Sequence, residues 1–162
     1  MNNIYPKHYL PKHLSVKDRS FQIQQLNKSR KLYKKNKFFQ RPKVKSFRSK
    51  PSTHVKNAKE LYKTDSIIPS RKLAIATKCS SKALEKIANK GRGAYYSSGS
   101  RPNQTAESWA IARLASAITG GNASISDYHI LNKGCRMNSK ALKMAKQTCK
   151  KQNKCNNKTR KK

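Results

Sequence analysis

Residues 73–90 read LAIATKCSSKALEKIANK and have the apolar spacing of two short helices joined by a tight turn. Ala74 is small enough to let two helices cross closely, and Cys79 would fill the turn. In the second helix, Leu84 and Ile87 are three positions apart, so both would face inward. Helix-turn-helix units have this layout. We therefore predict a mainly α fold in which a small helical domain contains a helix-turn-helix-like hairpin.

The outward face of the second predicted helix is basic, because it carries Lys82, Lys86 and Lys90. Such a face suits contact with nucleic acid. However, Lys78 stands where a glycine often sits in this turn, and two helices joined by a tight turn are also common without any DNA contact. A nucleic-acid-reading unit and a plain helical hairpin therefore both fit these residues.

Further helices are indicated on both sides of this hairpin. Ser15 and Asp18 form a capping box that opens a helix extending to about Lys35. Its apolar stripe is thin, so we expect this helix to lie on another surface rather than to form a core. Another helix is expected to start near Ser139. The remaining predicted helices cover residues 54–62, residues 105–119 and a short segment containing Tyr128, Ile130 and Leu131.

The loop predicted after the hairpin reads GRGAYYSSGSRPNQ, residues 91–104. Gly91 and Gly93 are expected to end the second helix, because glycine disfavours helical backbone. The serines near Arg92 and Arg101 could ring an anion, with the N-terminus of the next helix pointing toward it. A loop that is polar only because it lies at the surface fits the same residues.

Charge divides the chain into three parts. There are 39 Lys and Arg residues against 6 Asp and Glu, a formal net charge of +33. Residues 1–68 hold 18 basic and 3 acidic residues, residues 69–134 hold 10 and 3, and residues 135–162 hold 11 and none. We expect a basic N-terminal arm with one or two helices over residues 1–68, a small helical domain over residues 69–148 and a Lys/Asn-rich disordered tail over residues 149–162. Both arms are long and basic, and we expect them to be partly disordered until they meet a partner.

This uncompensated charge indicates a polyanionic partner, and nucleic acid is the commonest one. In the Pro-containing segment 38–53, Phe38, Phe39 and Phe47 could stack on bases, although a solvated linker with aromatic side chains docked on the domain fits as well. The predicted nucleic-acid-binding residues, which would contact mainly the phosphate backbone of DNA, are Lys34, Lys35, Lys37, Arg41, Lys43, Lys45, Arg48, Lys50, Lys82, Lys86, Lys90, Arg92 and Arg101.

Catalysis and metal binding are not expected from this sequence. The 6 acidic residues are scattered along the chain, and no motif surrounds the pairs that His129 could form with Cys79 or Cys135. The 4 cysteines include no CxxC pair, so neither a metal site nor another cofactor is predicted. We expect free thiols, although a disulfide between Cys79 and Cys135 is conceivable.

No membrane anchor is expected. No apolar run approaches the roughly 20 residues of a spanning helix, and the N-terminus lacks the apolar stretch of a signal peptide. These features favour the cytosol, the nucleus or the inside of a particle.

Three segments together are similar to a known family. They are KSRKLYKKNKFF at residues 28–39, KLAIATKCSSKALEKIANK at residues 72–90 and GRGAYYSSGSRPNQTAESWAIARLASAITGG at residues 91–121. They resemble a basic protein family of unknown function from nucleocytoplasmic large DNA viruses, with shorter relatives in marine phages. The resemblance covers roughly residues 9–145. It implies a viral origin and a place in the virion, with host cytoplasm or nucleus as the location during infection.

These observations lead to three hypotheses. The first is a non-enzymatic, virion-associated protein that packages or condenses nucleic acid by neutralising phosphates. The second is a minor capsid protein whose basic arms thread between coat subunits. The third is a regulator that reads DNA sequence with the helix over residues 81–90.

Overall fold

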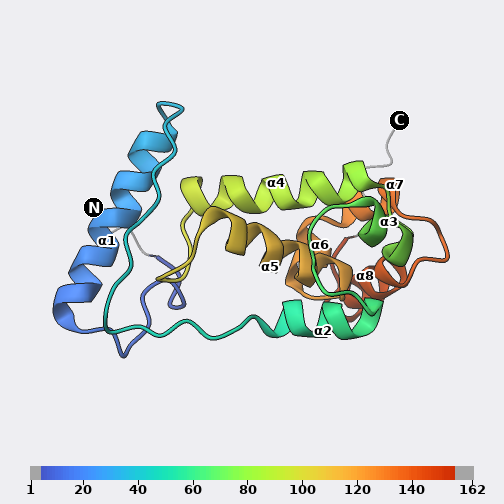
Figure 1. The fold of residues 1–162 in the computed structure, drawn as a ribbon, viewed down its shortest axis with the longest axis horizontal. Coiled ribbons are helices and arrows are strands. Elements are labelled where there is room, and N and C mark those ends of the chain that lie inside the picture. Colours follow the sequence, from blue (N-terminus) through green and yellow to red (C-terminus); the bar gives the residue numbers. More distant parts are fainter. Residues whose placement is uncertain (1–4, 156–162) are drawn as a thin grey trace. The chain divides into compact units, whose positions relative to one another are not determined.

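The computed structural model describes residues 5–155, and within this range the chain forms eight α-helices (Figure 1). Extended pairing among these residues is limited to one antiparallel bridge, between Cys79 and Cys135. The prediction of a mainly α fold is therefore confirmed. The helices are α1 (Val16–Tyr33), α2 (Thr53–Tyr62), α3 (Arg71–Thr77), α4 (Ser81–Ser97), α5 (Ala106–Ile118), α6 (Asn122–Ser126), α7 (Tyr128–Gly134) and α8 (Lys140–Lys151).

Serine side chains begin five of these helices. Each stands before a first helical residue and accepts a hydrogen bond from the backbone N–H three residues later, and these serines are Ser15, Ser52, Ser70, Ser80 and Ser139. Each cap satisfies a donor that has no partner within its helix. The predicted starts at Ser15 and Ser139 are confirmed, and α2 begins one residue before the predicted His54.

The predicted end of α4 is wrong, because the helix continues through Gly91 and Gly93 to Ser97. Partners far away in the sequence stabilise its last turn. The Ser29 hydroxyl donates to the Tyr96 carbonyl at 3.1 Å, and the Arg41 guanidinium donates to the Tyr95 carbonyl at 2.7 Å. These carbonyls would otherwise lack hydrogen-bond partners. The two hydrogen bonds offset the loss of helix stability, about 1 kcal/mol for each glycine within the helix.

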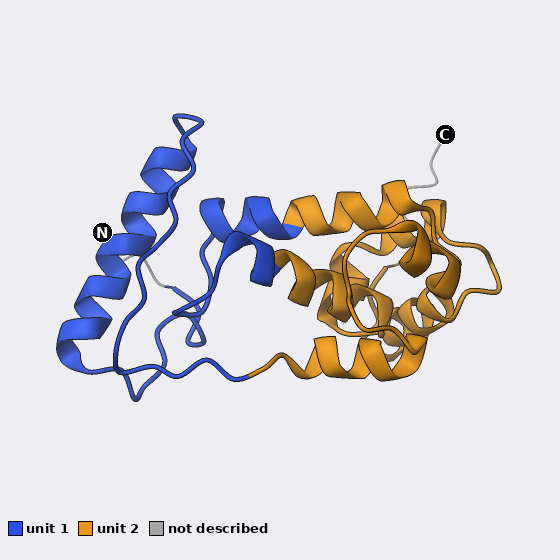
Figure 2. Cartoon of the chain, in the orientation of Figure 1, with its two compact units in different colours: residues 1–50, 91–109 blue, residues 51–90, 110–162 orange. Residues whose placement is uncertain are grey.

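The chain forms two compact units (Figure 2). Unit 1 contains Met1–Lys50 and Gly91–Trp109, and unit 2 contains Pro51–Lys90 and Ala110–Lys162. The N-terminal segment thus belongs to the same unit as the Ser/Gly-rich segment, and its expected disorder is not confirmed. Of the tail predicted over residues 149–162, the last seven residues lie outside the part that the structure describes.

The interior of unit 1 is small and rich in tyrosine. Tyr5, Tyr9 and Leu26 are buried together, and Trp109 packs against them. Leu26 comes from the thin apolar stripe of α1, so this helix contributes to the core of unit 1, contrary to the expectation that it would not form one. Gly99 has a φ of +117°, and a Cβ there would lie 2.7 Å from Leu26 Cδ2, so only glycine fits at this point of the unit.

Unit 2 holds the main hydrophobic core. Its fully buried large side chains are Ile67, Leu73, Leu84, Ile87, Leu114, Ile118, Leu131 and Leu142. The inward placement of Leu84 and Ile87 was predicted from their spacing. Helices α6, α7 and α8 pack on one another around this core. α3 and α4 are present with three residues between them, but a DNA-reading helix-turn-helix stays a prediction.

The expectation of free thiols is wrong. Cys79 is bonded to Cys135, and Cys149 is bonded to Cys155. The first disulfide lies beside two backbone hydrogen bonds, from the Ser80 N–H to the Gly134 carbonyl at 2.8 Å and from the Arg136 N–H to the Lys78 carbonyl at 2.9 Å. Sequence spacing alone could not show that folding brings these distant cysteines together.

Candidate nucleic-acid interface

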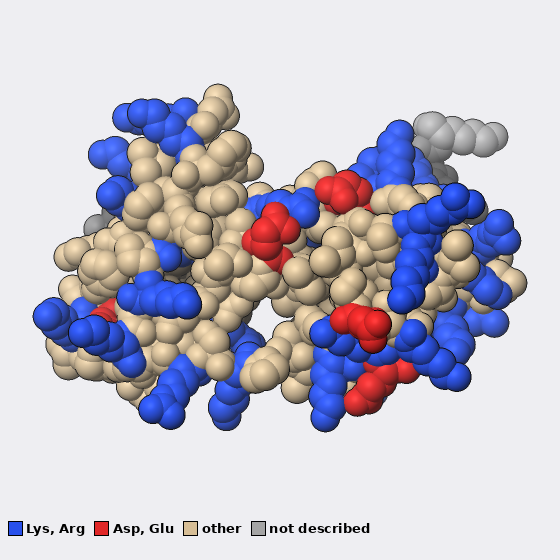
Figure 3. Space-filling view, viewed as in Figure 1, with Lys and Arg blue, Asp and Glu red and all other residues tan. Residues whose placement is uncertain are grey.

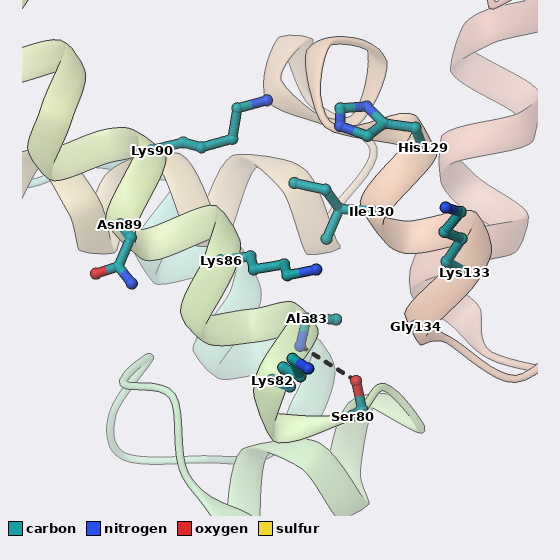
Figure 4. Close-up of a pocket in the computed structure, with 10 residues that line it drawn as sticks. All are labelled: Ser80, Lys82, Ala83, Lys86, Asn89, Lys90, His129, Ile130, Lys133 and Gly134. Carbon is teal, nitrogen blue, oxygen red and sulfur yellow. Dashed lines mark hydrogen bonds between the residues drawn. The ribbon is translucent and has the colours of Figure 1, made fainter.

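A groove of about 470 Å³ lies between α4 and α7 in unit 2 (Figure 4). Four of its ten lining residues are lysines, and none of the ten is acidic. We call it the basic groove. Its lining residues are Ser80, Lys82, Ala83, Lys86, Asn89, Lys90, His129, Ile130, Lys133 and Gly134.

Helical periodicity places basic side chains along both walls. On α4, Lys82, Lys86 and Lys90 follow one another at intervals of four residues, which puts them on one exposed face. On α7, His129 and Lys133 are also four residues apart and exposed. Figure 4 shows Lys86 extending from α4 toward α7, while His129 and Lys133 stand on the α7 side.

The two walls are held close at one end. Gly134, the last residue of α7, lies directly against Ala83 of α4, and a Cβ on Gly134 would overlap the Ala83 side chain. The Cys79–Cys135 disulfide joins the residues that flank this contact. A covalent link and a close backbone approach therefore fix the spacing between the walls.

Lys90 differs from the other lysines of the groove because it is paired with a buried carboxylate. Its Nζ lies 3.0 Å from Asp127 Oδ1. Arg113 Nε donates to Asp127 Oδ2 at 2.8 Å, and Arg113 Nη2 donates to Oδ1 at 2.9 Å. Burial alone would raise the pKa of Asp127, but the bonds and charges of Arg113 and Lys90 outweigh burial, so the pKa is lowered.

The exposed charge of the groove therefore comes chiefly from Lys82, Lys86 and Lys133. Ammonium groups in this arrangement bind phosphate oxygens as point charges without demanding a fixed geometry. Each phosphate that they neutralise releases condensed counterions from nucleic acid, which is a sequence-independent source of affinity. The arrangement thus suits a polyanion better than a small ligand that needs enclosure.

Most of the residues of unit 1 that were predicted to bind nucleic acid lie at its surface. Figure 3 shows Lys and Arg spread over the face drawn, with Asp and Glu in only a few places. The exposed predicted residues of this unit are Lys34, Lys35, Lys37, Lys43, Lys45, Arg48, Lys50 and Arg101.

Arg41 does not lie at the surface, which corrects its predicted role. Its side chain donates to Ser29 Oγ at 2.9 Å, to the Tyr95 carbonyl at 2.7 Å and to Ser100 Oγ at 2.7 Å. The guanidinium also lies 3.8 Å from the centre of the Tyr95 ring. Burial, which leaves the residue only 6% exposed, lowers the pKa of this guanidinium. Arg41 therefore holds unit 1 together and is not available to a phosphate.

Arg92 and the Ser/Gly-rich loop are also engaged within unit 1. Arg92 pairs with Glu107, and the hydrogen bond from Arg92 lowers the pKa of the Glu107 carboxyl. The Ser100 hydroxyl accepts from Arg41, so this serine already has a cationic partner within the protein. Anion binding by the loop stays a prediction.

Four polar groove residues were absent from the predicted set: Ser80, Asn89, His129 and Lys133. Asn89 could have been found from its position one residue before Lys90 on α4. His129 and Lys133 flank the buried Ile130 and Leu131 at helical spacing, which marks them as outward-facing. Nothing local indicated that this face of α7 lies opposite α4.

No group of three or more His, Cys, Asp or Glu residues able to hold a metal ion occurs within residues 5–155. Over the same range, no helix combines the length and the apolar character needed to cross a bilayer.

Comparison with known proteins assigns a family. The chain matches no curated protein and no solved structure. One family model, that of a family of unknown function (DUF5824), matches residues 6–133, which is well over half of the chain. The protein therefore belongs to DUF5824, a family of unknown function.

Proposed function

We propose that this protein is a non-enzymatic nucleic-acid-binding protein that neutralises phosphates through the basic groove and through the exposed lysines and arginines of unit 1. Its role is to package or condense a genome, and DNA is the expected form. A virion setting, in host cytoplasm or nucleus during infection, is part of the proposal and rests on the family resemblance of the sequence.

The observation that carries the proposal is the lining of the basic groove. Lys82, Lys86 and Lys133 are exposed there, and no acidic side chain is among the ten lining residues. Bringing like charges together costs free energy, because they repel one another in the absence of a counterion. A partner rich in phosphate removes this cost on binding.

A non-enzymatic role agrees with the state of the cysteines. A thiolate nucleophile activated by His129 would require a free sulfur at Cys79 or Cys135. Both sulfurs are used in the disulfide between these two residues.

The proposal is tested by titrating a labelled random-sequence DNA duplex with the full chain at salt concentrations from about 50 to about 200 mM. We expect submicromolar affinity at the lowest salt, with log affinity falling linearly against log salt. Absence of binding in dilute buffer would contradict the proposal.

Two further binding experiments separate the alternative roles. A minor capsid protein whose arms lie in acidic protein grooves would bind polyglutamate at least as tightly as a nucleic acid of similar charge. A sequence-reading regulator would prefer some duplexes, and replacing Lys82 and Lys86 by alanine would remove that preference. For phosphate neutralisation we expect the same substitutions to weaken binding to all duplexes equally.

A further inference from the structure

Unit 1 carries three aromatic rings close together: Tyr33, Phe38 and Tyr96. The ring centres of Phe38 and Tyr96 are 5.2 Å apart, those of Tyr33 and Phe38 are 6.1 Å apart, and those of Tyr33 and Tyr96 are 6.4 Å apart. The Tyr33 and Tyr96 planes are nearly parallel, at 9°. We call this cluster the aromatic patch.

Backbone hydrogen bonds hold the patch in place. α1 ends at Tyr33, and a tight turn follows in which the Lys37 N–H donates to the Leu32 carbonyl at 2.9 Å. Asn36 has a φ of 57°, which reverses the chain and brings Phe38 back beside Tyr33. The Tyr96 ring packs nearly perpendicular to the buried Tyr95 ring, with the two ring centres 5.1 Å apart. The rings are therefore arranged before any ligand arrives, which limits the entropy cost of binding.

The patch is open to solvent. Phe38 is 70% exposed, the highest value among the aromatic side chains of the described residues. A phenylalanine that served only to fill the interior of unit 1 would be buried, as Tyr5 and Tyr95 are. The outer face of the Phe38 ring is thus available for contact with another flat apolar group.

The rim of the patch is basic. Lys34, Lys35 and Lys37 belong to the turn between Tyr33 and Phe38, and all three are exposed. Figure 3 shows Lys and Arg side chains over the end of α1, where this turn lies. Residues 28–50, which include the whole turn, contain no acidic residue. A flat apolar surface bordered by ammonium groups is complementary to an unpaired base attached to a phosphate backbone.

We propose that the aromatic patch is a binding site for single-stranded nucleic acid, in which an unpaired base stacks on Phe38 and the adjacent phosphates contact Lys34, Lys35 and Lys37. This site goes beyond phosphate neutralisation in the basic groove, because it recognises the base. Bases of an intact duplex are stacked on their neighbours, so the patch favours single strands, loops and frayed ends.

The test compares two labelled strands of equal length and charge, an oligothymidylate and a strand made entirely of abasic nucleotides. Both are titrated with the full chain and with the Phe38→Ala variant. We expect the wild-type protein to bind the thymidylate more tightly than the abasic strand. Phe38→Ala should weaken thymidylate binding by about fivefold or more and leave binding to the abasic strand unchanged.

Two further variants act as controls. Ile75→Ala removes an apolar side chain with the same 70% exposure from α3 of unit 2, and it should leave both affinities unchanged. Phe38→Trp keeps an aromatic face and should retain the preference for the thymidylate. Because Phe38 is largely exposed, its replacement should leave the helical circular dichroism spectrum unaltered.

The outcomes distinguish this site from the basic groove. Lys82→Ala with Lys86→Ala should weaken binding to both strands equally, whether or not the patch stacks on bases. Equal affinities of the wild-type protein for the two strands would overturn the aromatic site and leave the groove untouched. A change in oligomeric state on Phe38→Ala, without any base-dependent loss, would assign the patch to self-association and would also overturn the proposal.

Discussion

Asp127 is the residue whose replacement should destabilise unit 2 most clearly. Its side chain is fully buried and accepts three hydrogen bonds, two from Arg113 and one from Lys90. Asp127→Asn keeps the size of the side chain but removes the negative charge. The Arg113 side chain, which is only 23% exposed, would then be a half-buried cation with no counter-ion.

The expected cost follows from this geometry. Breaking a buried ion pair by removing one partner costs about 3–5 kcal/mol. The lower end applies here, because the Lys90 side chain is 43% exposed and can turn toward water. We therefore expect the free energy of unfolding of unit 2 to fall by about 3 kcal/mol, which at a slope of about 2 kcal/mol per molar corresponds to a urea midpoint lower by about 1.5 M.

Urea unfolding followed by circular dichroism measures this shift. Glu107→Gln provides a comparison with an exposed ion pair, because Glu107 of unit 1 pairs with Arg92 but its side chain is 66% exposed. Exposed pairs contribute less than about 1 kcal/mol, so the midpoint of this variant should move by less than about 0.5 M. Equal shifts in the two variants would refute the reasoning that burial makes the Asp127 network strong.

Two other predictions concern the stability of the same unit. The lowered pKa of Asp127 means that its contribution is fully present above the unfolded-state pKa of about 3.9 and is lost as pH falls through the folded-state value. The wild-type urea midpoint should therefore decrease below about pH 4 more steeply than that of Asp127→Asn, and parallel pH profiles would contradict this. Replacing Cys79 and Cys135 together by serine opens a cross-link with a sequence separation of 56 residues. Without the cross-link the unfolded chain gains entropy, so the free energy of unfolding should fall by about 4 kcal/mol. The measurement is the difference in the free energy of urea unfolding between this double variant and the oxidised wild-type protein. A loss below about 1 kcal/mol would show that the cross-link does not constrain the unfolded chain.

Local signals in the sequence predicted much of the helical structure. A serine cap depends on residues within one turn, so Ser15 and Ser139 indicated helix starts correctly. The inward faces of Leu84 and Ile87 depend only on helical periodicity, and both residues are fully buried. The end of α4 could not be predicted in this way, since Ser29 and Arg41 stabilise it from more than fifty residues away.

The basic groove was predictable on one wall only. The spacing of Lys82, Lys86 and Lys90 identified the exposed face of α4. Lys133 on the opposite wall comes close because Gly134 approaches Ala83 and because the cysteines on either side are bonded. These are tertiary contacts between distant segments, and composition carries no information about them. Arg41 shows a second limit of sequence reasoning. Its place in a basic run predicted an exposed side chain, but the side chain is buried because neutral hydrogen-bond acceptors surround it.

The central claim is that the basic groove binds phosphates, and the salt dependence of duplex affinity tests it most directly. The decisive comparison is between two triple alanine variants with the same reduction in charge. One replaces Lys82, Lys86 and Lys133 in the groove. The other replaces three exposed lysines of α2 and α8 that do not line it: Lys56, Lys59 and Lys140.

For the groove variant we expect the slope of log affinity against log salt to become shallower by about 1 for each phosphate that is no longer neutralised, or about 3 in all. The slope of the control variant should change by less than about 1. Equal changes in both variants would show that net charge alone attracts the nucleic acid, and an unchanged slope in the groove variant would show that the groove does not bind phosphates.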